Sequence, residues 1–208
     1  MIEEQADTKT RLLDAAEKLF GQNGFDATSL RDITAEAQVN LASVNYHFQS
    51  KDSLIDAVIA RRLEPLNQKR IQMLDTAGPS PTVEQILEAF MAAVIDEDIW
   101  PAGPFIGRVF SNPNQFLGRV FKKHLAGVGQ RFRDALAKAL PVLPAEEIQW
   151  RLHFMAGAMS HVLVLAEVLP VMSGGLCSPQ DRSALMARLV TFLAAGFRAP
   201  SPPRLEGN

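Results

Sequence analysis

Cysteine is nearly absent from this chain of 208 residues, and so is any surplus of positive charge. The single Cys177 excludes a disulfide within the chain and a metal site built mainly from cysteine. One thiol fits a reducing compartment, so we expect a cytoplasmic protein in which Cys177 is buried and inert. The N-terminal residues MIEEQADTKT are acidic and lack an apolar core, so we expect no signal peptide.

Internal repeats and low-complexity blocks are absent as well, but one nearly apolar stretch covers residues 153–176. A stretch of this length could cross a membrane. Its histidines and glycines, together with Glu167 and Pro170, argue against that. We therefore expect a helix that is buried on most sides and packed on a partner subunit, and no contact with a membrane.

Apolar residues recur every three or four positions through most of the chain, which predicts an all-α fold. Pro65 falls inside one of these patterns, where it either kinks the helix or starts a new one. The expected helices cover residues 8–22, 30–37, 41–48, 51–77, 83–98, 105–111, 114–140, 144–169 and 180–197.

The stretch from Thr28 to Leu54, TSLRDITAEAQVNLASVNYHFQSKDSL, contains the most informative pattern. Ser29 is a good N-cap for a first short helix, and Asp32 lies near the positive end of that helix. Residues 38–40 interrupt the apolar stripe before a second short helix begins. Two short helices with a link of this length indicate a helix-turn-helix. The second helix carries small and hydrogen-bonding side chains, which suit the major groove of DNA.

This stretch resembles the TetR family of bacterial one-component regulators. The matching features are T-S-x-R-D-I at 28–33, the core at 38–48 and S-K-x-S-L at 50–54. The variant VNLASVNYHF is most similar to the fatty-acid-responsive PsrA-type branch. One residue departs from the family pattern, because Gln38 stands where a glycine is usual. If that backbone is left-handed, Gln38 costs about 1 kcal/mol relative to glycine.

The resemblance implies a fold of two helical domains. Residues 1–64 would form an N-terminal three-helix helix-turn-helix domain that binds DNA, and residues 65–199 a C-terminal helical domain for ligand binding and dimerisation. Residues 200–208 are expected to be a disordered tail. The last two helices also resemble those of the PsrA-type branch, at WRLHFMAGA (150–158) and FLAAGFRA (192–199). They would form the interface of a homodimer that reads a palindromic operator in double-stranded DNA.

The resemblance also assigns roles to residues of the helix-turn-helix. Some side chains would contact phosphates, and the alternative for Tyr46 is a place in the core of the domain. The expected phosphate contacts are Thr28, Ser29, Tyr46, His47 and Lys51. The residues expected to face base edges or a thymine methyl are Asn40, Ala42, Ser43 and Asn45.

The overall charge gives no support to DNA binding. The net charge is −2, and residues 1–64 hold 7 Lys and Arg against 11 Asp and Glu, a net of −4. Phosphate binding needs only a local basic patch, however, and acidic residues such as Asp14, Glu17 and Glu36 can face away from DNA. We therefore expect modest affinity that salt weakens strongly.

The C-terminal half is rich in Phe, Met and Leu and contains no recognisable catalytic constellation. His153 and His161 are too far apart for a metal pair on one helix, so we expect no metal site and no cofactor. Arg108 is a candidate partner for a ligand carboxylate, although an exposed arginine is the plainer interpretation. Ordinary core is likewise the alternative for each apolar candidate. The residues that could line an apolar ligand pocket are Met91, Phe105, Phe110, Phe116, Phe121, Trp150, Phe154 and Met155, with His153 as a polar partner.

These features predict a dimeric transcription regulator, a repressor in the simplest case, that an apolar small molecule releases from DNA. The PsrA-type resemblance suggests a fatty acid or an acyl-CoA. One alternative is a regulator of the same fold that is controlled by a protein partner or by nothing. A second alternative is an enzyme with His153 or His161 as a base, but no nucleophile or metal set accompanies either residue. We therefore expect a protein that is not an enzyme.

Overall fold

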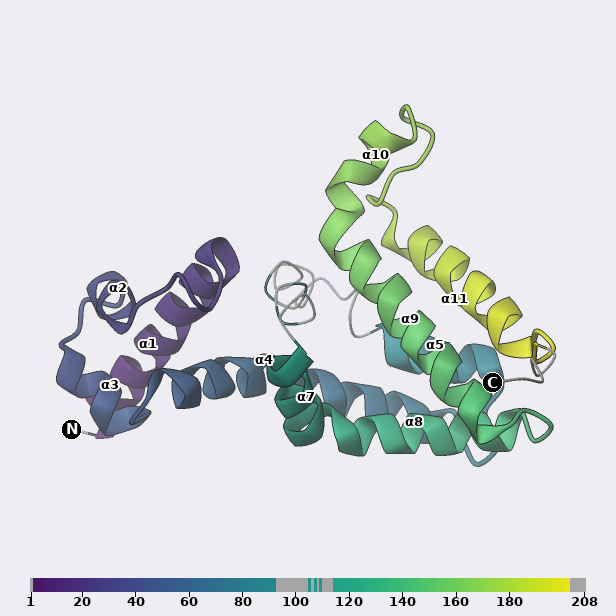
Figure 1. Cartoon of the computed structure of the whole chain (residues 1–208), viewed down its shortest axis with the longest axis horizontal. Helices are drawn as coiled ribbons and strands as arrows, with labels where there is room; N and C mark the ends of the chain where they lie inside the picture. The colour runs from purple at the N-terminus through teal and green to yellow at the C-terminus, as the bar shows by residue number, and fades with distance from the viewer. Residues whose placement is uncertain (1, 93–104, 106, 108, 110–113, 203–208) are drawn as a thin grey trace, which may run out of the picture. The chain divides into compact units, whose positions relative to one another are not determined.

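The computed structural model describes residues 2–92 and 114–202, together with Phe105, Gly107 and Val109. All regular secondary structure in these residues is helical (Figure 1), which confirms the expected all-α class. The helices are α1 (Ile2–Asn23), α2 (Leu30–Glu36), α3 (Leu41–His47), α4 (Lys51–Thr76), α5 (Val83–Ala92), α7 (Asn114–Val120), the π-helical turn η2 (Phe121–Leu125), α8 (Ala126–Ala139), α9 (Ala145–Leu165), the 3-10 turn η3 (Ala166–Val168), α10 (Leu169–Met172) and α11 (Arg182–Arg198).

The chain divides into two compact units, which we call the head and the C-terminal unit. The head consists of Met1–Pro65 and Pro104–His124, and the C-terminal unit of Leu66–Gly103 and Leu125–Asn208. The first division lies one residue from the limit expected from the sequence. The second segment of the head was expected in the C-terminal domain instead.

The core of the head forms where α1 packs against α2 and α3. Phe25, just after α1, has its ring centroid 5.1 Å from that of Phe20, 6.0 Å from Phe105 and 5.0 Å from Phe116. Aromatic pairs at these distances are mutually stabilising. Phe105 and Phe116 therefore belong to the aromatic core of the head. The fully buried aliphatic residues beside them are Leu12, Ala16, Ile33, Val44, Leu54 and Val58.

Helix α4 continues through Pro65 from Lys51 to Thr76. The alternative in which Pro65 starts a new helix was therefore wrong. A proline at this position removes one backbone donor and crowds the carbonyl one turn earlier. Buried leucines on both sides, Leu63 and Leu66, keep the helix packed across this position.

In the C-terminal unit α5 packs against α8 and α11, and α9 packs against α8 and α11. Arg151 on α9 is buried and donates to the carbonyls of Phe197 at 2.7 Å and Ala199 at 2.8 Å. These bonds satisfy carbonyls at the end of α11 that have no partner within the helix. The arginine thus ties the start of α9 to the end of α11.

Several helices end earlier than the sequence suggested. The pattern over 114–140 is interrupted by the π-helical turn at Phe121–Leu125, and the pattern over 144–169 leaves the α conformation after Leu165. The end of the pattern over 83–98, most of that over 105–111 and most of the tail from residue 200 lie outside the described residues. Cys177 was expected to be buried but is exposed.

The segment Ala145–Met172 is long and apolar enough to cross a membrane by length and composition, with a mean hydropathy of 1.7. One face of α9 packs inside the C-terminal unit, and that face includes the charged Arg151. Much of the remaining apolar surface of the segment is exposed in the single chain. In the single chain the segment is thus buried on one face and exposes much of its other apolar surface, so burial on most sides would need a partner subunit and stays a prediction.

Candidate nucleic-acid interface

Both short helices of the head begin with a side-chain cap. The Ser29 Oγ accepts a hydrogen bond from the Asp32 amide at 3.2 Å, and an Asp32 carboxylate oxygen accepts one from the Ser29 amide at 2.9 Å. Hydrogen bonds from the Ser29 hydroxyl and amide lower the pKa of Asp32 below its ordinary value. The Asn40 Oδ1 in turn accepts from the Ser43 amide at 2.9 Å. These caps define the starts of α2 and α3 within one residue.

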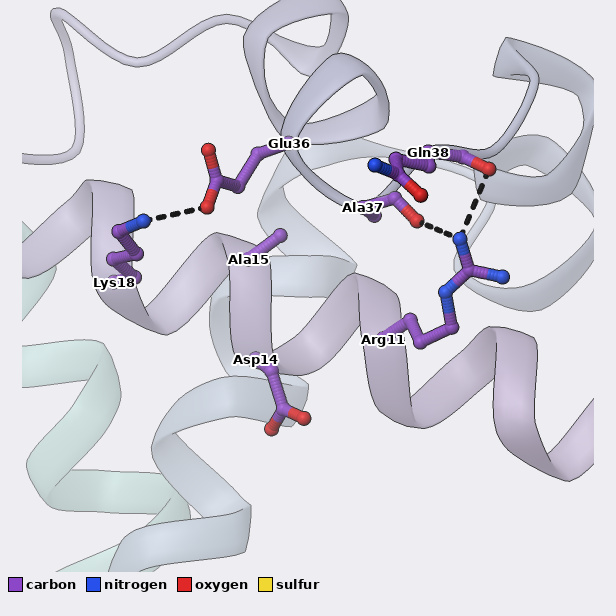
Figure 2. A pocket seen from close by; sticks show the side chains of 7 residues that line it. All are labelled: Arg11, Asp14, Ala15, Lys18, Glu36, Ala37 and Gln38. Atoms are coloured by element: carbon purple, nitrogen blue, oxygen red, sulfur yellow. Dashed lines mark hydrogen bonds and ion pairs between the residues drawn. The ribbon is translucent and has the colours of Figure 1, made fainter.

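The turn between α2 and α3 has a left-handed residue at Gln38, whose φ is 54°. Arg11 on α1 donates through Nη2 to the carbonyl of Ala37 at 2.5 Å and to that of Gln38 at 3.1 Å (Figure 2). Both carbonyls lie at the C-terminal end of α2, where the helix dipole favours a cation. The turn therefore keeps its geometry without the usual glycine because α1 provides a guanidinium beneath it.

The outward face of α3 contains Leu41, Ala42, Asn45 and Tyr46, all exposed. Residues four apart share a helix face, and the opposite face carries the fully buried Val44. Tyr46 is 70% exposed, so the alternative that placed it in the core was wrong. Ala42, Asn45 and Tyr46 thus lie on one exposed surface of α3.

The side chains that were expected to contact DNA differ in their exposure and in their hydrogen bonds within the head. Thr28 is 1% exposed, and its hydroxyl bonds the Gly24 carbonyl at 2.8 Å inside the head, so its side chain cannot reach a phosphate from this position. Asn40 and Ser43 lie at the start of α3, with the Ser43 hydroxyl donating to Asn40 Oδ1 at 3.0 Å. Ser29 is exposed, but its hydroxyl donates to Asp32 at 2.6 Å.

The junction of α3 and α4 holds two of the residues that were expected to contact phosphate, His47 and Lys51. His47 ends α3, and its ring centroid lies 5.0 Å from that of Tyr46 in an edge-to-face contact. Lys51 begins α4, where Ser50 caps the helix by accepting the Ser53 amide at 3.1 Å. A helix N-terminus with a lysine in its first turn attracts anions. Figure 1 shows this junction directly after α3 at one end of α4.

Two glutamates of the head form ion pairs with cations of the same unit. Glu36 accepts from Lys18 at 2.6 Å. Glu17 accepts from Arg61 at 2.5 Å and from Arg62 at 2.6 Å. These pairs lie on α1, α4 and the end of α2, away from the exposed face of α3. The pairs use three of the seven Lys and Arg residues of this region, so the net charge of residues 1–64 remains −4.

The described residues that were expected to line one apolar pocket belong to two different units. Phe105 and Phe116 pack on Phe25 of the head, whereas Met91 and Met155 are buried in the C-terminal unit. Phe121 on the π-helical turn is 47% exposed. Arg108 and Phe110 lie outside the described residues.

Trp150, His153 and Phe154 lie on an exposed aromatic face of α9. The Trp150 and Phe154 rings stack at 5.9 Å, and both residues line an open hollow of about 450 Å³ beside the end of α11. His153 packs against both rings. Phe192 on α11 is also exposed, at 70%. These side chains form an exposed apolar surface on the outside of α9 and α11.

His161 is the second histidine of α9. It is exposed and lines a small apolar cavity of about 110 Å³ with Leu165, Leu169 and Leu185. In the part of the chain that the structure describes, no group of three or more His, Cys, Asp or Glu residues is arranged to hold a metal ion.

Sequence reasoning missed two arginines that the structure singles out. Arg11 supports the recognition turn, and Arg70 is buried in the C-terminal unit. The signal for Arg70 was its position on the apolar stripe of α4, in line with Leu63, Leu66 and Leu74. No pattern around Arg11 pointed to a turn 26 residues away.

Comparison with known families agrees with this geometry. Residues 12–58 match the family described as bacterial regulatory proteins, tetR family, and residues 84–196 match the tetracyclin repressor-like C-terminal domain. The first match contains α2 and α3 entirely. The second covers more than half of the chain.

Individual relatives point the same way. The chain is 33% identical over 145 residues to the HTH-type transcriptional repressor Rv3405c of Mycobacterium tuberculosis, covering 68% of this chain and 70% of the relative. It is 32% identical over 149 residues to the HTH-type transcriptional regulator UidR of Escherichia coli, covering 66% and 71%. The fold is similar to that of the fatty acid degradation regulator FadR from Bacillus halodurans, with a TM-score of 0.67 at 16% identity over 93% of this chain and 97% of FadR. The chain therefore belongs to the TetR family of DNA-binding transcriptional regulators and is not an enzyme.

Proposed function

We propose that the protein is a cytoplasmic repressor that binds a palindromic operator as a homodimer and leaves it when an apolar effector binds. The observation that carries the DNA half is the exposed face of α3, where Ala42, Asn45 and Tyr46 project from a helix capped at Asn40. Small residues allow a helix to enter the major groove, and Asn45 can pair with adenine. Tyr46, His47 and Lys51 surround this face with groups that bond phosphate oxygens.

The homodimer is proposed from the outer surfaces of α9 and α11. Trp150, Phe154 and Phe192 are large apolar side chains, and each is more than half exposed to solvent in the single chain. Exposed apolar patches of this kind mark association surfaces. A second copy of the same two helices would cover them, and two heads related by a two-fold axis would read two half-sites.

For the effector we propose a fatty acid or an acyl-CoA. Two similarities support this: the PsrA-type character of VNLASVNYHF, and the likeness in fold to a regulator named for fatty acid degradation. The mechanism would be a two-state shift in which the effector favours a dimer whose α3 helices no longer match successive major grooves. The alternative is a regulator controlled by a protein partner or by nothing, which a fully packed C-terminal core would favour.

The effector half is tested by release from DNA. The protein is bound to a dye-labelled duplex enriched from random sequence, and long-chain acyl compounds are added while fluorescence anisotropy is followed. We expect one range of chain lengths to reduce affinity by 5- to 150-fold, the usual size of allosteric coupling, written as about 1–3 kcal/mol. Unchanged anisotropy at saturating acyl concentration would keep the DNA function and favour the alternative.

A further inference from the structure

Arg70 in the second half of α4 is a charged side chain in the core of the C-terminal unit. Its residue exposure is 2%, which is the lowest of the buried charged residues in the described part of the chain. It lies on the same face of α4 as Leu66 and Leu74, both buried. A charge in such a position is costly unless other groups compensate it.

The groups that surround the guanidinium are all neutral. Its Nε donates to the carbonyl of Phe90 at 2.9 Å and its Nη1 to Asn67 Oδ1 at 3.2 Å. Its Nη2 has only the sulfur of Met159, at 3.8 Å. The guanidinium carbon lies 4.0 Å from the centroid of the Phe90 ring. Among the described residues, each terminal nitrogen therefore keeps one N–H without an acceptor, and two such N–H groups are what a carboxylate needs to bind in a bidentate manner.

The other buried arginine among the described residues, Arg151, differs from Arg70 in having a carboxylate partner. Arg151 has the carboxylate of Glu147 at 3.2 Å in addition to its carbonyl partners. Arg61, Arg131 and Arg198 also have acidic partners. Within the described residues, no carboxylate lies within 4 Å of the Arg70 guanidinium. Burial lowers the pKa of Arg70 to about 9, so the side chain still carries its charge at pH 7.

We propose that Arg70 receives the carboxylate of an amphiphilic effector whose apolar body lies against Phe90 and Met159. The second aromatic layer is Phe132, whose ring centroid is 5.0 Å from that of Phe90. A methionine beside two phenylalanines adapts to flexible apolar ligands. This assignment rests on the effector half of the proposed function and sharpens it. The free acid is the effector class, because the acyl carbonyl of a thioester carries no charge to pair with Arg70.

The proposal is tested with a fluorescent probe pair, 11-(dansylamino)undecanoate and its methyl ester, on the full-length protein. We expect the wild-type protein to bind the acid on the order of 100-fold more tightly than the ester, the effect of one buried charge-assisted pair. Arg70→Met keeps length and apolarity but removes the charge, and should bring that ratio close to one. Arg131→Gln is the matched control, because Arg131 is an exposed arginine of the same unit, and it should keep the wild-type ratio.

The unfolding midpoint separates ligand binding from a purely structural role. If Arg70 only secures the end of α5 through the Phe90 carbonyl, Arg70→Met lowers the midpoint and leaves the acid preference intact, which overturns the proposal. If Arg70 is a ligand anchor, the midpoint of Arg70→Met stays equal or rises, since an apolar side chain replaces an unneutralised buried charge.

The remaining outcomes also decide the matter. Equal binding of acid and ester by the wild-type protein, or no binding of either, contradicts the role of Arg70. Release of DNA by the ester as well as by the acid would keep the proposed effector function while removing Arg70 from it.

Discussion

At the scale of single residues, the turn between α2 and α3 has Gln38 where the family usually has glycine, and Arg11 stabilises the turn. Gln38 adopts a φ of 54°, where a side chain is strained and glycine is not. Arg11 stabilises the two carbonyls of this turn from α1. The sequence predicted the strain, because the position was identified by resemblance. It could not predict the compensation, because Arg11 is 26 residues from Ala37 and reaches it only through the fold.

Gln38→Gly should therefore stabilise the protein by about 0.5–1 kcal/mol. This value is the free-energy cost of a left-handed residue with a side chain minus the entropic cost of ordering a glycine on folding. The measurement is the midpoint of urea unfolding followed by circular dichroism. Gln72→Gly is the control, because Gln72 is exposed on α4 and helical there, and it should lose up to about 1 kcal/mol. A loss of stability in both variants would mean that Gln38 is not strained.

Arg11→Ala tests the compensation itself. Removing the guanidinium leaves two carbonyls at the end of α2 without this partner and should cost about 1–3 kcal/mol of stability. Combined with Gln38→Gly, which permits the turn locally, part of that loss should be recovered. If the double variant is as unstable as the sum of the single changes predicts, the two residues act independently.

At the scale of elements, the C-terminal unit is held together by contacts between helices far apart in sequence. Glu84 on α5 and Arg198 at the end of α11 form a two-pronged ion pair, with the second contact at 2.6 Å. Hydrogen bonds from Arg198 lower the pKa of Glu84 to about 2 from its ordinary value of 4.5. Because the folded pKa is lowered, the pair stabilises the protein fully above pH 4.5 and loses its effect as the pH falls toward 2.

Glu84→Gln should accordingly weaken the dependence of the free energy of unfolding on pH between about pH 4.5 and pH 2. At pH 7 it should cost only about 0.5–1 kcal/mol, since both side chains are more than 40% exposed and water screens the pair. Thermal unfolding across this pH range provides the measurement, and Arg198→Gln should reproduce the same profile. A wild-type profile in either variant would show that the pair contributes nothing measurable.

The elements were predictable where periodicity is strong and local. Apolar spacing predicted the longer described helices, but not α10 or the 3-10 turn η3 before it. The N-caps at Ser29 and Asn40 lie where the pattern changes. The π-helical turn at Phe121–Leu125 was not predictable, because its residues Lys123 and His124 form hydrogen bonds with Asp56 on α4. Partial burial works to raise the pKa of Asp56 there, but hydrogen bonds from Lys123 and His124 overcome it and lower the pKa. Such tertiary bonds leave no periodic trace in the sequence.

At the scale of the whole molecule, the proposed homodimer depends on the outer surfaces of α9 and α11. Phe154→Asp and Phe192→Asp place a charge on these surfaces without touching the core, since both residues are more than 60% exposed. Each variant should sediment as a monomer at concentrations where the wild-type protein is a dimer. Val142→Asp is the control, because Val142 is 94% exposed on the loop between α8 and α9. If both Phe variants sediment as dimers, the outer surfaces of α9 and α11 are not the dimer interface.

The candidate site was less predictable as a whole than its motif suggested. The face of Ala42, Asn45 and Tyr46 follows from helix geometry, whereas the burial of Thr28 depends on carbonyls of Leu19 and Gly24. The ligand residues were chosen for their apolar character alone, and the fold distributes them between two units. A buried charge, Arg70, was hidden among polar neighbours because only its register on α4 distinguished it.

The central claim is that α3 reads a specific sequence, and the most direct measurement is selection of random duplexes by the purified protein at low salt. We predict that the wild-type protein enriches a palindrome with half-sites about one helical turn or a multiple of it apart. Asn45→Ala should lose preference at one position in each half-site, at a cost of about 1–3 kcal/mol per base pair, and keep the rest of the palindrome. No enriched sequence for the wild-type protein would contradict the claim and leave the acidic balance of residues 1–64 as the better guide.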